Sequence, residues 1–150
     1  TRPPAPMVGG NYYIDESAEL AEVQGRKYLA HTMRAAMQNY SLNKPGTFTS
    51  IKGYEHYENM TMEPEAVPAY AEEFGKGAVT GTPQMILERM WELKQAYRPQ
   101  GFFPHVYFGG MPQDEARKNM KLFAEKVLPE VKSWTADDAS IDDRFLEAAE

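Results

Sequence analysis

The sequence predicts an α/β fold in which parallel strands alternate with helices. Three short apolar segments, 11–14, 77–81 and 105–108, are each followed by a stretch whose apolar residues recur at helical spacing. Such alternation favours a parallel sheet with right-handed crossovers. The chain has 150 residues, of which 42% are hydrophobic and 25% charged, as expected for one globular domain.

The first strand-helix unit begins near the N-terminus. Two glycines interrupt the chain before the strand expected at 11–14, and Asp15 or Ser17 is a suitable N-cap for the helix that follows. We expect this helix to end near Tyr40 and to bury one apolar stripe. The stripe consists of Leu20, Val23, Ala30, Met33, Met37 and Tyr40.

The second unit has a clear helix start. Thr82 can cap the helix and Pro83 can occupy its first position, after a small-residue strand at 77–81. Arg98 and Pro99 end the helix. Its predicted inward stripe is Ile86, Met90, Leu93 and Tyr97, with Lys94 among the residues facing water.

The third unit is predicted as a central strand at 105–108, with Pro104 confined to its beginning. Gly109 and Gly110 form the turn, and the helix that follows is expected to stop at Pro129. The apolar face of this helix consists of Ala116, Met120, Phe123, Val127 and Val131.

A long connection, residues 41–76, separates the first two units and contains a short helical segment at 64–74. Connections of this length are often functional, for example as lids. Tyr54, His56 and Tyr57 lie close together in it. If it closes over a pocket, His56 and Tyr57 can donate hydrogen bonds to a substrate or a peroxide. Alternatively, the aromatic residues hold the loop against the body of the protein.

The charge distribution and the composition of the chain argue against several classes of protein. Residues 135–150 carry six acidic residues against Arg144, so most of the net charge of −6 lies there. The near-neutral remainder has no basic stripe for nucleic-acid phosphates. No apolar run reaches the roughly 18 residues of a membrane span. Cysteine is absent, which excludes disulfides and fits a reducing, cytoplasmic location.

No metal site is predicted. The three histidines, His31, His56 and His105, are never three or four residues apart, and no acidic cluster has EF-hand spacing. We expect His31 to be solvated on its helix. His105 begins its strand, which favours a packing or surface role.

Five short segments carry a likeness to known proteins. They are 12–19, 52–57, 80–83, 108–112 and 122–129. In this order and spacing they resemble the C-terminal part of the bacterial luciferase-like, flavin-dependent monooxygenases. The likeness covers roughly residues 5 to 133. We therefore expect residues 1–134 to be the C-terminal part of a luciferase-like barrel domain, and residues 135–150 to be an acidic, flexible tail.

The resemblance implies a partial (β/α) TIM-type barrel containing the last three strand-helix units and a long inserted loop. A complete barrel typically needs about 250 residues. The family oxidises small organic substrates with O2 and reduced FMN, or uses a deazaflavin in one branch, and a separate flavin reductase supplies the reduced cofactor. The missing first five units supply most flavin contacts in the family. The resemblance thus implies a chain that is inactive without them.

In a parallel barrel the reactive groups lie at the carboxyl ends of the strands. The candidate cofactor-binding residues there are Thr80, Phe108, Gly109 and Gly110, and the candidate catalytic residues are His56 and Tyr57. The glycine pair also has a purely structural interpretation, because a tight strand-to-helix turn requires glycine in any case.

Two other functions stay open. An open parallel sheet has two unpaired edges, so the chain could be a non-catalytic half-barrel that associates with itself or with an N-terminal partner chain. It could also derive from a deazaflavin-dependent oxidoreductase that transfers hydride without oxygen.

Overall fold

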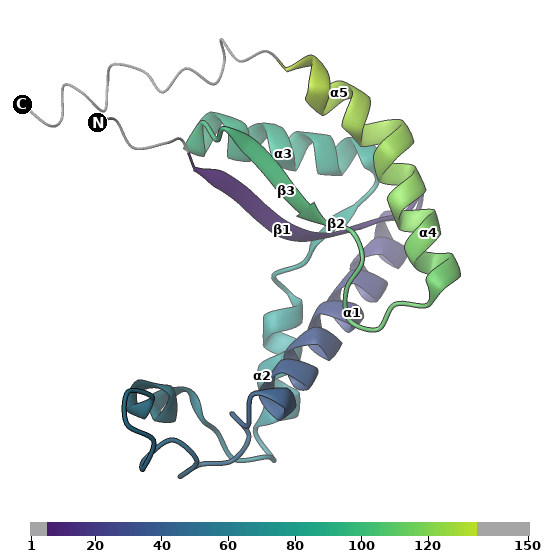
Figure 1. The fold of residues 1–150 in the computed structure, drawn as a ribbon. Coiled ribbons are helices and arrows are strands. Elements are labelled where there is room, and N and C mark those ends of the chain that lie inside the picture. The colour runs from purple at the N-terminus through teal and green to yellow at the C-terminus, as the bar shows by residue number, and fades with distance from the viewer. Residues whose placement is uncertain (1–5, 135–150) are drawn as a thin grey trace, which may run out of the picture.

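The computed structural model describes residues 6–134, which form a three-stranded parallel sheet in the order β2-β1-β3 (Figure 1). The central strand is β1 (Met7–Ile14), and the two edge strands are β2 (Val79–Gly81) and β3 (Gly101–His105). The predicted α/β class and its parallel sheet are confirmed. The predicted tail, 135–150, lies outside the described residues.

Helices connect the strands and follow the last of them. They are α1 (Ala18–Asn39), the 3-10 helix η1 (Glu55–Met60), α2 (Val67–Gly75), α3 (Pro83–Tyr97) and α4 (Gln113–Leu122), which continues through the π-helical η2 (Phe123–Val127) into α5 (Leu128–Ser133). The predicted caps are present, since the side chains of Ser17 and Thr82 accept hydrogen bonds from the backbone N–H groups of Leu20 and Met85. No helix within residues 6–134 is both long and apolar enough to cross a bilayer.

The strand order places β1, not β2, at the centre of the sheet. A run of three consecutive barrel strands would place them in chain order. Here β3 pairs with residues 7–11 of β1, whereas β2 pairs only with residues 12–14. The β1–β3 pair is therefore the longer ladder, and β2 is a short addition at the opposite edge of β1.

Two strand positions differ from the predictions. The first strand begins at Met7, because Gly9 and Gly10 continue the ladder opposite Phe103 and Pro104. The last strand covers 101–105 instead of 105–108, so Pro104 lies inside it. A proline fits there because β3 is an edge strand with one free side.

The last helix continues past Pro129 to Ser133. The prediction of a stop was based on the clash between a proline ring and the carbonyl four residues earlier. The π-helical turn changes that spacing, because the backbone N–H of Leu128 donates to the carbonyl of Phe123, five residues back. Pro129 then occupies the first turn of α5, where a missing N–H costs little.

The two faces of the sheet pack against different helices. Tyr13 packs with residues of α1, including Ala21, Tyr28 and Leu29. Tyr12 and Ile14, which point to the other face, pack with α3 and η2. In Figure 1, β3 crosses in front of α3, and α1 extends away from the sheet alongside α2.

The buried face of α1 differs from the predicted stripe. Ala30 and Met37 are buried as predicted, but Leu20, Val23 and Tyr40 are exposed. The reason is Gly25, where an added Cβ would stand 3.0 Å from the Cβ of Tyr13 and would overlap the methyl group of Thr80. The small residues of α1 thus face the sheet and let the helix approach closely.

Two further burial predictions were partly wrong. On α3, Ile86 and Met90 are buried, but Tyr97 is exposed and Lys94 is buried, its ammonium group lying over the ring of Trp91. On the last helix, Ala116, Phe123 and Val127 are buried whereas Met120 is exposed. Periodicity located each apolar face but not its edges.

Candidate functional site

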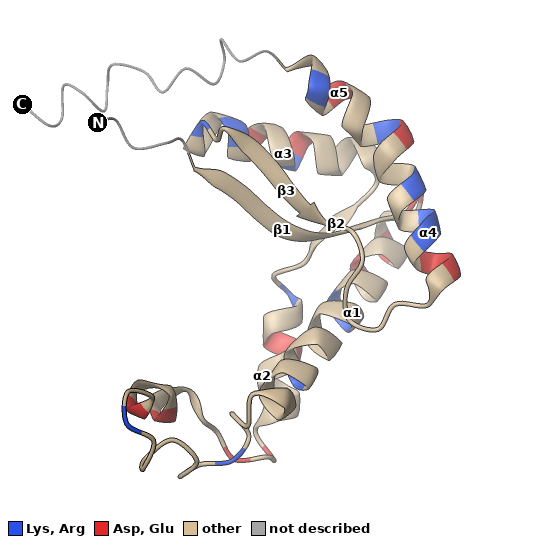
Figure 2. Cartoon of the chain, in the orientation of Figure 1, with Lys and Arg blue, Asp and Glu red and all other residues tan. Residues whose placement is uncertain are grey.

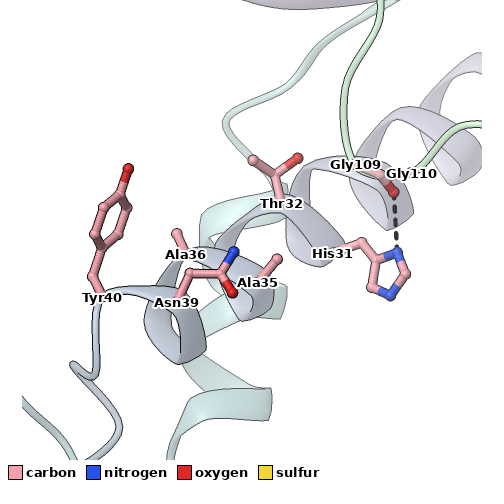
Figure 3. Close-up of a pocket in the computed structure, with 8 residues that line it drawn as sticks. All are labelled: His31, Thr32, Ala35, Ala36, Asn39, Tyr40, Gly109 and Gly110. Carbon is pink, nitrogen blue, oxygen red and sulfur yellow. Dashed lines mark hydrogen bonds between the residues drawn. The ribbon is translucent and has the colours of Figure 1, made fainter.

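A pocket of about 410 Å³ lies between the second half of α1 and the turn that follows β3 (Figure 3). Its α1 residues share one stripe of the helix. They are His31, Thr32, Ala35, Ala36 and Asn39, and Tyr40 at the C-cap completes this wall. The turn contributes Gly109 and Gly110. This end of the sheet holds the carboxyl ends of the strands, where parallel α/β folds place their ligands.

The two glycines of this turn have different roles. Both have positive φ, 65° at Gly109 and 70° at Gly110. A Cβ on Gly109 would stand 2.9 Å from the Cα of Tyr28 and would overlap its carbonyl group. A Cβ on Gly110 would meet only Nδ1 of His31, 3.7 Å away. Gly109 is therefore required by packing against α1, whereas Gly110 leaves open space on the pocket side.

His31 connects the two walls of the pocket. Its Nδ1 lies 3.0 Å from the carbonyl oxygen of Gly109. A carbonyl oxygen can only accept, so Nδ1 carries the hydrogen, and in the neutral imidazole Nε2 is the acceptor. The expectation that His31 is a merely solvated helix residue overlooked this contact, which joins residues 78 positions apart in the chain.

Of the four candidate cofactor-binding residues, only the glycine pair lines the pocket. Phe108 is 8% exposed and packs in the core with Tyr13 and Tyr28. Thr80 lies beneath α1 at Gly25. Both therefore have packing roles in this structure.

His56 and Tyr57 lie in η1, beyond the end of α1 that is remote from the sheet (Figure 1). Their rings are 4.0 Å apart, and Tyr57 also contacts Phe48 and Tyr54 at 5.8 and 5.7 Å between ring centroids. Neither residue lines the pocket. The aromatic residues pack mainly on one another, which gives the loop a small core of its own.

A polar cluster joins β1, α1 and α4 beneath the turn. The hydroxyls of Tyr13 and Tyr28 donate to the two carboxylate oxygens of Glu115, Tyr28 at 2.5 Å. Burial, and then the hydrogen bond to this carboxylate, raise the pKa of Tyr28 to about 12. The same two causes raise the pKa of Tyr13. Both phenols thus stay protonated as donors at neutral pH.

Asp15 and Lys118 form an ion pair beside this cluster, with Nζ and Oδ2 2.5 Å apart. Burial acts to raise the pKa of Asp15, but the hydrogen bonds from Lys118 and from the backbone of Ser17 outweigh it and lower that pKa. Asp15 therefore stays ionised and holds the start of α1 against α4.

Asn119 joins the strands to α4 from the other side. Its Oδ1 accepts from the N–H of Ile14 at 2.8 Å, and its Nδ2 donates to the carbonyls of Tyr12 and Val106 at 2.9 and 2.7 Å. Its side chain is almost fully buried. Sequence analysis missed it because a polar residue inside a helix gives no signal of which backbone groups it will meet.

The lining of the pocket fits an uncharged organic group. It offers methyl groups, a phenol, an amide, a hydroxyl and an imidazole, and it contains no Lys, Arg, Asp or Glu. A flavin phosphate is usually held by cations or by a helix N-terminus. The pocket therefore suits an uncharged organic group, and its lining offers no cationic side chain to a phosphate.

Within residues 6–134, no three His, Asp or Glu side chains gather as metal ligands would. Comparison with protein-family models gives no match for this chain, and comparison with curated proteins gives none either.

Proposed function

We propose that this chain is the C-terminal portion of a flavin-dependent monooxygenase, in which it forms one wall of the substrate pocket. The proposal combines the sequence resemblance with one structural observation, a patch of the sheet that no side chain within residues 6–134 covers. The surface consists of Met7, Gly9 and Asn11 of β1 together with Phe103 and His105 of β3. We refer to it as the open face.

The open face is unusual for a small protein. Phe103 is 61% exposed and Met7 is 57% exposed, and β1 and β3 contain no Lys, Arg, Asp or Glu, as the tan strands of Figure 2 show. Large exposed apolar surface normally marks a site that something else covers. In a parallel barrel the helices lie outside and the other strands cover the inner face. The open face has the apolar character of such an inner face, although α1 packs on its carboxyl-terminal continuation at Tyr13.

The strand order is compatible with this proposal if β1 and β3 are neighbouring barrel strands. Their ladder covers five residue pairs, and α3 with η2 packs on the face opposite the open face. In this arrangement β2 is a short strand at the mouth of the barrel, since it pairs only with the last three residues of β1. The proposal thus assigns two barrel strands to this chain instead of three.

In the proposed enzyme, bound reduced flavin supplies the electrons that activate O2 for oxidation of an organic substrate. This chain would contribute the turn at Gly110 and the α1 stripe to the wall of the pocket. The cationic groups for the phosphate would come from the N-terminal units, because the lining of this pocket has none. FMN alone should therefore bind poorly to the isolated chain.

The proposal is tested by joining the N-terminal strand-helix units of a luciferase-like monooxygenase ahead of Pro6. We expect the joined protein to retain FMN through gel filtration and to consume O2 when a reductase supplies reduced FMN. Circular dichroism and thermal unfolding establish that it is folded. A folded joined protein that retains neither FMN nor a deazaflavin would contradict the proposal.

The open face also favours a second function, in which the chain is a non-catalytic half-barrel that pairs with another copy of itself. The free edges of β2 and β3 would support such pairing. Light scattering coupled to gel filtration distinguishes the two proposed functions, because it measures whether the chain is a monomer or a dimer. A stable dimer that Phe103→Lys dissociates would favour association, whereas a monomer favours the C-terminal portion of an enzyme.

A further inference from the structure

We propose that the pocket between α1 and the turn after β3 binds an elongated, uncharged phenol, whose hydroxyl donates to Nε2 of His31. The inference depends on the proposed function in one respect, that this ligand stands for the substrate. The binding itself involves only residues of this chain.

A contact with the turn fixes the orientation of the His31 ring. Its Nδ1–H is engaged by the carbonyl of Gly109, 3.0 Å away. Its Nε2 has no hydrogen-bond partner in the part of the chain that the structure describes, and the side chain is exposed. A neutral imidazole held in this way presents a fixed acceptor, so its best partner is a ligand O–H or N–H.

The groove is long and follows the second half of α1. Between His31 and Tyr40 the floor is made of the methyl groups of Ala35 and Ala36 (Figure 3). Asn39 lies eight positions after His31 along the helix, which corresponds to about 12 Å at 1.5 Å per residue. A ligand that covers this floor is therefore elongated and apolar along its length.

The lining of the groove favours an uncharged ligand. No Lys, Arg, Asp or Glu side chain lines the groove, so an anion or a cation would lose hydration there without a side chain of opposite permanent charge. At the far end, Asn39 and Tyr40 supply an amide and a phenol for a second hydrogen bond or a ring contact. A neutral phenol with an extended aromatic body matches all three features.

The test uses the full 150-residue chain with 15N-labelled histidine and two probes. The probes are 4-phenylphenol and 4-methoxybiphenyl, which share a shape but differ in the proton donor. We expect 4-phenylphenol to bind about five- to tenfold more tightly and to shift the Nε2 resonance of His31, as one hydrogen bond would. Equal binding of both probes, or binding of neither, would overturn the inference.

Two variants separate the ligand contact from the contact with the turn. His31→Asn keeps a donor near the position of Nδ1 but is too short to place an acceptor at the position of Nε2, so both probes should bind it equally. His31→Gln keeps an acceptor near the position of Nε2, so it should still prefer 4-phenylphenol. The reverse result would show that only the contact with Gly109 matters and would overturn the inference.

Two more variants locate the probe. Ala35→Leu fills the floor at an exposed position and should abolish binding of both probes, whereas Gln38→Leu, on α1 outside the pocket, should leave binding unchanged. Loss of probe binding in both variants, or in neither, would show that the probe does not bind in this pocket. No flavin is present in these measurements, so their failure is distinguishable from failure of the proposed monooxygenase function.

Discussion

Gly109 lies against the backbone of Tyr28, so close that a Cβ on the glycine would overlap the tyrosine carbonyl. The contact joins the turn after β3 to the middle of α1. It brings His31, one helical turn after Tyr28, within hydrogen-bonding distance of the Gly109 carbonyl. The pocket therefore exists because one position of the turn has no side chain.

This contact predicts a specific cost for Gly109→Ala. We expect the free energy of unfolding to fall by more than 2 kcal/mol, roughly the sum of a left-handed backbone cost and a steric clash. Gly46→Ala is the matched control, since Gly46 has a φ of 88° and open space around it. Gly46→Ala should cost only about 1 kcal/mol. Equal costs in urea denaturation would show that the contact with α1 is unimportant.

The buried amide of Asn119 predicts a second effect. Asn119→Ala leaves the N–H of Ile14 and the carbonyls of Tyr12 and Val106 without this partner, which we expect to cost about 2–4 kcal/mol. Asn119→Asp keeps the shape and the acceptor for Ile14 but sets an oxygen against the two carbonyls. It should therefore destabilise the fold comparably at neutral pH. A cost below 0.5 kcal/mol for both variants (about the level of surface substitutions) would refute the bridging role.

The raised pKa of Tyr28 predicts an alkaline limit to stability. Its folded-state pKa of about 12 lies above the ordinary value of about 10. The phenol therefore stabilises the fold fully below pH 10, and this contribution is lost as the pH rises through 12. Tyr28→Phe should cost about 1.5–3 kcal/mol at pH 7, typical of a hydrogen bond to a charged group.

The measurement is the free energy of unfolding between pH 8 and 12. The wild-type protein should lose stability more steeply above pH 10 than Tyr28→Phe does. Tyr97→Phe removes a hydroxyl from an exposed ring and serves as the control. If the wild type and Tyr28→Phe decline in parallel, Tyr28 does not contribute through its protonated form.

The sequence predicted the helices better than the strands. The caps at Ser17 and Thr82 and the periodicity of α1 and α3 are local features, so they could be located from residue types alone. The limits of β3 could not be located in this way, because its register is set by pairing with β1, some 90 residues earlier. The continuation of the last helix past Pro129 depends on a π-helical turn that has no simple sequence signal.

The candidate site was predictable only in part. Gly109 and Gly110 are recognisable as a turn, and the structure places them in the pocket. His31 was missed because its importance comes from a contact with Gly109, which depends on the tertiary fold. Conversely, His56 and Tyr57 were predicted as catalytic residues from their residue types alone. The structure places them in a separate aromatic group.

The central claim is that the open face is the inner face of a barrel, and thiol labelling tests it most directly. The chain has no cysteine, so Phe103→Cys and Tyr97→Cys each introduce a single probe at positions that are both 61% exposed. Each is compared in the isolated chain and in the protein joined to N-terminal barrel units. We predict that joining slows labelling of Phe103→Cys by about tenfold or more, the effect of a local opening cost of about 1.4 kcal/mol, and leaves Tyr97→Cys unchanged. Equal labelling of Phe103→Cys in both proteins would contradict the account.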